Sequence, residues 1–220
     1  MTDIYSDLDF PDAAEDRPYT FIDMVSTIDG KTLSGGRNES VADLGSKLDH
    51  FLLRRIESMA NAILLGAGTL RANPPSWSPK TQIRVVVSSS GVLPYDAPFF
   101  EKGAFVAVPT SGRIDPPQNV SLLKSGQDRV DVGTLMRQIR DLGVSRLLVL
   151  GGSELNAQLL ENDLVDELFL TIAPKIKLGR GVPTYAGGNP LDRDHLKAFS
   201  LLESNVVEDE VFLRYRRVIA

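Results

Sequence analysis

Residues 146–174 read RLLVLGGSELNAQLLENDLVDELFLTIAP, and the order of elements in this segment indicates the fold class. The apolar run 146–150 predicts a buried strand that enters a glycine pair. Residues 153–161 predict a helix, and 167–173 predict a second strand that Pro174 ends. A strand, a helix and another strand in this order favour a parallel sheet covered by helices.

The same alternation extends along most of the chain. Further strands are predicted at 19–25, 62–65, 83–87, 104–108 and 120–123, and helices at 40–59 and 132–142. We expect the first helix to begin at Ser40 as N-cap, with Asp43 in the capping-box position. Residues 198–203 and 211–215 predict an antiparallel pair. The fold class is therefore α/β, a three-layer sandwich with a mainly parallel mixed sheet and antiparallel C-terminal strands.

Composition restricts the function. The chain has 220 residues, 42% of them hydrophobic and 24% charged, which is typical of a folded protein. It has no cysteine and two histidines, so disulfides, cysteine nucleophiles and a histidine-rich metal site are not expected. The net charge of −5 argues against a nucleic-acid surface, and no apolar run is long enough for a membrane helix. We expect a flexible or loosely docked acidic leader at 1–17 and a single domain at 18–220.

Two glycine motifs follow predicted strands. Gly66-Ala67-Gly68-Thr69 follows the strand 62–65, and Gly151-Gly152-Ser153-Glu154 follows the strand 146–150. Each alone can be an ordinary turn, but glycines also let a phosphate approach backbone amides closely. Ligands of open α/β sheets bind outside the carboxyl ends of the strands. Two such motifs in one sheet therefore favour a dinucleotide or phosphate ligand.

Acidic residues give two further motifs. Asp29, in Thr27-Ile28-Asp29-Gly30-Lys31, could hold a substrate or relay a proton, and the alternative is an Asp-Gly turn. Asp163, Asp166 and Glu167 alternate with apolar residues, and we interpret them as a solvated corner between a helix and a strand.

These motifs resemble a known family, the pyrimidine reductases of riboflavin biosynthesis. The family includes stand-alone archaeal-type enzymes and the C-terminal domain of the bacterial bifunctional deaminase–reductase. The resemblance runs from Tyr19 to Tyr185 and rests on 27–31 (TIDGK), 66–69 (GAGT), 147–156 (LLVLGGSELN), 164–167 (LVDE), and 173–175 with 183–185 (APK, PTY). It implies a dihydrofolate-reductase-like fold. The chain has no zinc-ligand signature of a deaminase.

The resemblance implies an NADPH-dependent reductase, cytoplasmic and homodimeric, that converts the ribosyl group of a phosphorylated aminopyrimidine to a ribityl chain. Asp29 would orient or protonate the substrate, with Asp23, Thr27 and Leu150 also in the substrate half. The implied cofactor contacts are Gly66, Gly68, Thr69, Asn73, Ser88, Ser89, Ser90, Gly151, Gly152, Ser153 and Glu154, with the serines at the 2′-phosphate end. The resemblance implies no metal.

Two residues depart from the family pattern. Asp23 stands where the family commonly has Lys or Asn, and Leu150 stands where it commonly has Glu. Both changes fall in the substrate half, which leaves open a different pteridine-like or carbonyl substrate. A non-catalytic nucleotide-binding protein is the other alternative. The residues that would bind the substrate phosphate are not ranked by the sequence; the candidates are Arg37, Arg54, Arg71, Arg84 and Lys175.

Overall fold

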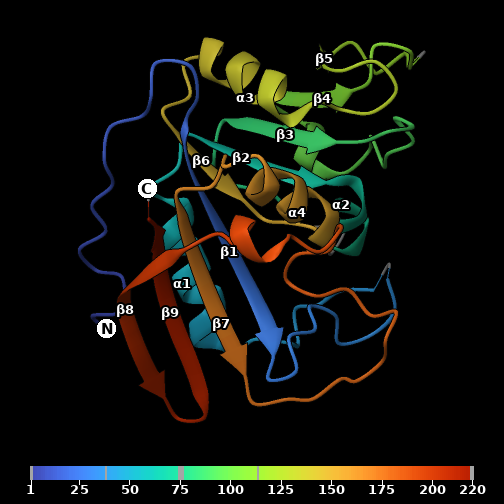
Figure 1. The fold of residues 1–220 in the computed structure, drawn as a ribbon. Coiled ribbons are helices and arrows are strands. Elements are labelled where there is room, and N and C mark those ends of the chain that lie inside the picture. The colour runs from blue at the N-terminus through green and yellow to red at the C-terminus, as the bar shows by residue number, and fades with distance from the viewer. Residues whose placement is uncertain (1, 38, 74–76, 113, 219–220) are drawn as a thin grey trace.

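One nine-stranded sheet organises the computed structural model, which describes residues 2–37, 39–73, 77–112 and 114–218 (Figure 1). The strands are β1 (Tyr19–Thr27), β2 (Ala62–Gly66), β3 (Ile83–Val87), β4 (Ala104–Val108), β5 (Val120–Lys124), β6 (Arg146–Val149), β7 (Glu167–Ala173), β8 (Phe199–Val207) and β9 (Glu210–Arg217). Their order across the sheet is β5-β4-β3-β2-β6-β1-β7-β9-β8. Neighbours are parallel except β9, which runs antiparallel to both β7 and β8. The predicted mainly parallel mixed sheet is confirmed.

Helices cover both faces of the sheet, which makes three layers (Figure 1). They are α1 (Lys47–Glu57), α2 (Ala67–Ala72), α3 (Val132–Asp141) and α4 (Ser153–Glu161), with short 3-10 turns at Pro98–Phe100 and Arg193–His195. Side chains alternate along β1, so Phe21 packs with α1 and α2, whereas Ile22 packs with α3 and α4. In the described ranges, none of the helices has the length and apolar character needed to cross a bilayer.

The helix α1 begins later than its hydrophobic pattern predicts. Ser46, rather than Ser40, is the N-cap, and its side chain accepts from the backbone N–H groups of Leu48 and Asp49. Leu44 is buried although it lies before the helix. The predicted start was therefore wrong because a buried loop residue continued the helical spacing.

The acidic segment 2–17 packs closely against the core of the sheet, whereas we expected a flexible or loosely docked leader. Its apolar side chains belong to the core, and they are Ile4, Tyr5, Leu8 and Phe10. The ring of Phe10 stacks on Phe21 with their centroids 4.6 Å apart. The acids of this segment stay mostly exposed between the buried positions. Alternation of apolar and acidic residues, rather than flexibility, explains its composition.

Two of the acids interpreted as a solvated corner are buried. Glu167 has no exposed surface, and three side chains donate to it: Tyr19, Arg214 and Arg216. Asp166 is also buried and pairs with Arg17 at 2.6 Å. The interpretation was wrong for these residues because their arginine partners lie far away in the sequence. Of the three acids, Asp163 alone is exposed, and it pairs with Lys197.

Candidate active site

A cleft of about 860 Å³ opens at the carboxyl ends of β1, β2, β3 and β6. Its walls come from these strand ends, from α1, from the first turns of α2 and α4, and from the loops at 31–41 and 180–188. This is the edge where ligands of open α/β sheets bind. Across the described parts of the chain, no three side chains of His, Asp and Glu gather in a way that could hold a metal ion.

The two glycine motifs touch each other at this edge. The N–H of Gly66 donates to the carbonyl of Gly151 at 2.7 Å, because β2 and β6 are adjacent and parallel. A Cβ atom added to Gly66 would lie 3.4 Å from the backbone nitrogen of Gly152. One added to Gly152 would lie 3.2 Å from Oγ1 of Thr69. A side chain at Gly152 would therefore be tight against Thr69, whereas a Cβ atom at Gly66 would make an ordinary contact.

The second motif leads into the helix α4. Gly152 is its N-cap and supplies no side-chain acceptor for the N–H groups of the first turn. Gly152, Ser153 and Glu154 all line the cleft. Free amides and the helix dipole make such an end attractive to an anion.

The structure brings most of the predicted cofactor contacts into this one cleft. Those that line it are Gly66, Gly68, Thr69, Asn73, Ser89, Gly152, Ser153 and Glu154. Gly151 contributes the carbonyl that holds Gly66. Ser88 and Ser90 are not among the lining residues. Their hydroxyls accept from the amides of Gly91 and Val92, so they stabilise the turn after β3.

The predicted substrate residues divide into two groups. Asp23 and Leu150 line the cleft, whereas Thr27 and Asp29 do not. The Asp29 carboxylate accepts from the Thr27 hydroxyl at 2.6 Å and from the amides of Lys177 and Leu178. These hydrogen bonds lower the pKa of Asp29 to about 2, and the bond from the Thr27 hydroxyl makes the largest contribution. Asp29 thereby fastens the loop after β7 to the turn after β1.

Sequence reasoning missed one acid of the cleft, Asp49. It lies in the first turn of α1 and lines the cleft with Asp23. Burial raises the pKa of both carboxyls, and the charge of Asp49 adds to the effect on Asp23. The spacing of the helix could have indicated this position. Asp49 precedes the buried Leu52 and Ile56 by three and seven residues, so it lies on the same, inward face of α1.

The structure ranks the candidate basic residues. Arg37 and Arg71 line the cleft. The other three have internal roles: the Arg84 guanidinium donates to backbone carbonyls, Arg54 pairs with Glu57, and Lys175 donates to the carbonyls of Asp43 and Leu44.

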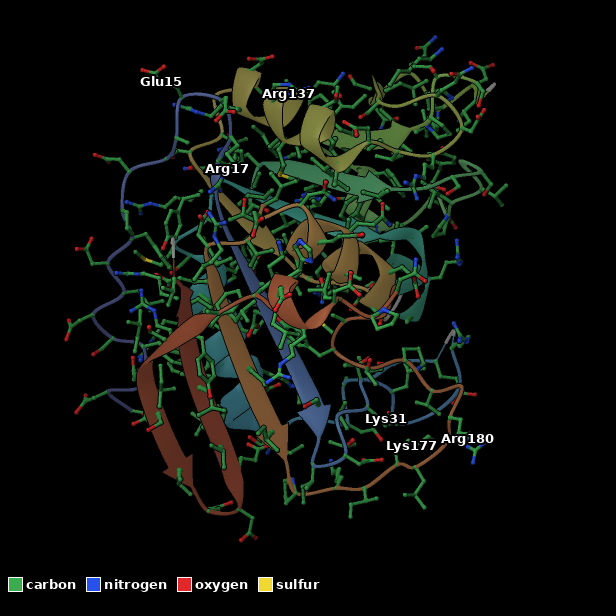
Figure 2. The ribbon with its side chains drawn as sticks, viewed as in Figure 1. Glu15, Arg17, Lys31, Arg137, Lys177 and Arg180 are labelled. Atoms are coloured by element: carbon green, nitrogen blue, oxygen red, sulfur yellow. The ribbon has the colours of Figure 1, made fainter. Side chains whose placement is uncertain are left out.

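Lys31 and Arg180 join Arg37 on one side of the cleft. The Arg37 guanidinium donates to the carbonyl of Gly181, which draws the two loops together. Lys31 and Arg180 also line the cleft, and Figure 2 labels both on the loops beyond the end of β1. We call Lys31, Arg37 and Arg180 the basic rim. The sequence did not single out Lys31 or Arg180 as binding residues.

Comparison with known proteins identifies the family. The family model for the RibD C-terminal domain matches residues 18–213. The chain belongs to the RibD C-terminal domain family. Within it, the chain is 29% identical over 194 residues to a protein of Archaeoglobus fulgidus, covering 78% of this chain and 87% of the relative. It is 30% identical over 197 residues to one of Methanothermobacter thermautotrophicus, covering 80% and 87%. Both relatives are named 2,5-diamino-6-ribosylamino-4(3H)-pyrimidinone 5′-phosphate reductase.

Solved structures share the fold of this RibD C-terminal domain. A pyrimidine reductase-like protein of Corynebacterium diphtheriae superposes with a TM-score of 0.76 at 18% identity, covering 92% of this chain and 93% of the other. RibD of Acinetobacter baumannii gives a TM-score of 0.74 at 18% identity and 92% coverage of this chain. The chain spans only 59% of that RibD structure.

Proposed function

We propose that this RibD-family chain is a reductase that uses NADPH to reduce a phosphorylated aminopyrimidine; the names of its relatives support the reductase activity and the substrate class. The observation that carries the proposal is the contact between the two glycine motifs at the edge of the cleft. A volume of about 860 Å³ also lies in the usual range for ligand pockets. The cleft therefore has space for a nicotinamide and a small substrate.

The residues present fit the cofactor. Gly66 to Thr69 and Gly152 to Glu154 would hold its pyrophosphate, because a Cβ atom at Gly152 would crowd Thr69 and the first turn of α4 has no side-chain cap. Ser89 and Arg71, which line the same wall, would bind a 2′-phosphate. When bound, NADPH supplies a hydride from its nicotinamide ring.

The chain's own residues would position the reactants. Met24 and Leu150 give the cleft an apolar surface that displaces water. The basic rim would bind the substrate phosphate, and Asp29 would act as a positioning residue by fixing the loop that carries Arg180. Hydride transfer depends chiefly on this alignment, so few catalytic side chains are needed.

The test is NADPH oxidation by purified protein with 2,5-diamino-6-ribosylamino-4(3H)-pyrimidinone 5′-phosphate. The proposal expects turnover with this substrate and formation of the ribityl product. Binding of NADPH with turnover of only another heterocycle would support the pteridine-like alternative, which the acidic Asp23 and the apolar Leu150 favour. NADPH binding with no turnover of any candidate would indicate a non-catalytic nucleotide-binding protein.

We further propose a homodimer formed through the edge strand β8. Several apolar side chains of β8 are exposed: Leu201, Leu202, Val206 and Val207. An apolar edge strand of this kind favours pairing with a second copy. Light scattering should give a dimer for the wild type and a monomer for Val206→Lys, and a monomeric wild type would contradict the proposal.

A further inference from the structure

A second, smaller cavity lies on the opposite side of the sheet from the cleft, at the amino ends of β1 and β7. It has a volume of about 280 Å³ and is enclosed by the N-terminal segment, the start of β1 and the end of β9. Because β1 has nine residues, about 30 Å of strand separates this cavity from the cleft. Figure 2 labels Arg17 at the start of β1 and Lys31 beyond its other end. We call it the arginine cavity, and its lining residues are Pro11, Asp12, Ala13, Ala14, Arg17, Tyr19, Asp166, Arg216 and Arg217.

Three arginines reach the arginine cavity, Arg17 from the N-terminal segment and Arg216 and Arg217 from the end of β9. Both terminal nitrogens of Arg17 donate to Asp166, at 2.6 and 2.7 Å. The Nε of Arg216 donates to Glu167 at 2.9 Å, and the Arg216 side chain stays 38% exposed. A guanidinium has five N–H groups, so these bonds orient the arginines and leave donors free for a ligand.

The ion pairs on this side of the sheet contain more bases than acids. They join five bases to three acids, and the members are Arg17, Lys197, Arg214, Arg216, Arg217, Asp163, Asp166 and Glu167. Asp12 and Asp16 also lie nearby, but both are exposed, so solvent and salt screen their charge. The arginine cavity is therefore a positive region on a chain whose net charge is −5, and it attracts anions.

One donor of the cavity wall has no acceptor. The Nε of Arg217 is enclosed and makes no hydrogen bond with the described residues. Its guanidinium is held loosely, because Nη1 lies 3.3 Å from Asp163, whereas Lys197 lies 2.8 Å from the same carboxylate. The Arg217 side chain is 17% exposed and lines the cavity, so it can turn toward an anion there. An unsatisfied buried N–H is unfavourable, and an oxyanion would supply the missing acceptor.

We propose that the arginine cavity binds a phosphate group, either as inorganic phosphate or as the end of a phosphate monoester. Guanidinium groups bind such oxyanions through paired N–H donors. Arg216 and Arg217 are consecutive on β9, so their side chains leave opposite faces of the strand, in agreement with their separate partners. Together with Arg17 they offer donors from several directions, which suits a tetrahedral phosphate better than a planar carboxylate. A volume of about 280 Å³ is below the usual range for larger ligands and suits a small anion.

The test is NMR of the wild-type protein labelled with ¹⁵N at arginine, in which each Nε–H group gives its own signal. Inorganic phosphate should shift the signals of Arg17, Arg216 and Arg217 along one saturation curve. Acetate at the same ionic strength should bind at least tenfold more weakly. Methyl phosphate distinguishes the two sources: matching shifts support a monoester site, and a response to inorganic phosphate alone supports a site for the free ion.

Variants test the arginine cavity against the cleft. Arg217→Gln should fold, because Asp163 keeps Lys197, and should weaken phosphate binding at least tenfold as read from the Arg17 and Arg216 signals. The matched control is Arg137→Gln, an exposed arginine of α3, which should bind like the wild type. The cleft variant Arg37→Gln should also keep the response.

The inference is overturned if phosphate leaves the signals of the three arginines unmoved, or if acetate shifts them with the same affinity. It is also overturned if folded Arg217→Gln keeps the wild-type affinity, or if Arg37→Gln abolishes the response. These signals report a site about 30 Å from the cleft, so the result is independent of NADPH binding and of the proposed function.

Discussion

Substitution of Gly68 by Asp isolates the anion-binding role of the first glycine motif. Gly68 lies in the first turn of α2, and a Cβ atom there would meet no heavy atom within 4 Å. Its φ is not positive, so an L-residue fits the backbone. An acid in the first turn of a helix is also favourable. We therefore expect Gly68→Asp to fold with unchanged or slightly higher stability.

The effect on the cofactor should be large. The new carboxylate would face the same space as the proposed pyrophosphate. Two unit charges about 5 Å apart at an effective dielectric constant of about 20 repel by about 3 kcal/mol. That energy corresponds to roughly a hundredfold loss of NADPH affinity. Gly68→Asn, which adds similar volume without charge, should lose much less, and the difference between the two variants should shrink at high salt.

The assay can use the chain's own fluorescence. Trp77 is the only tryptophan and lines the cleft, so NADPH binding should quench its emission. Titrations of the wild type, Gly68→Asp and Gly68→Asn give three dissociation constants. Equal constants for all three folded proteins would refute the assignment of Gly68 to the phosphate site.

Four other predictions follow from the same structure. Glu167→Gln should lower the free energy of unfolding by about 3–5 kcal/mol in urea, because two arginines would lose their buried partner. Asp29→Asn should reduce turnover more than NADPH affinity in steady-state kinetics. The factor by which turnover falls should stay constant above about pH 5, because the pKa of Asp29 is lowered to about 2. The contribution of the Asp29 carboxylate is lost only as pH falls toward that value. Arg71→Ala should weaken NADPH binding about tenfold and leave NADH binding unchanged. Because the pKa of Asp23 is raised in the folded protein, the neutral carboxyl stabilises the fold, and this contribution is lost as pH rises. The Tm of Asp23→Asn should therefore match or exceed that of the wild type at neutral pH, and the difference should disappear in acid.

Each of these has a result that would contradict it. A loss below about 1 kcal/mol for Glu167→Gln would show that the ion pairs contribute little. Unchanged turnover of Asp29→Asn would show that this residue only stabilises a turn. Parallel losses of NADPH and NADH affinity in Arg71→Ala would remove its role at the 2′-phosphate. A Tm difference for Asp23→Asn that is independent of pH would exclude titration of this carboxyl as its cause.

The sequence predicted the sheet well because apolar runs of four to seven residues are a local signal. The strand at 83–87 and the helix at 153–161 have the predicted bounds. The first helix was misplaced because Leu44 is buried in a loop and mimics helical spacing. The segment 2–17 was misjudged because single apolar residues among acids give no periodic signal.

Contacts between distant residues limited the prediction of the site. The two glycine motifs were local, so the sequence identified them as a joint site. It did not identify Asp49, whose approach to Asp23 depends on how α1 packs on β1. It also did not rank the basic residues, since their partners are backbone carbonyls reached only in the folded chain.

A crystal structure of the protein with NADPH bound tests most directly whether the two glycine motifs hold the cofactor's pyrophosphate. The pyrophosphate should lie between Gly66–Thr69 and Gly151–Glu154, in contact with amides from both motifs, and the 2′-phosphate should lie near Ser89 and Arg71. NADPH bound elsewhere, with both glycine motifs free of phosphate, would contradict this placement.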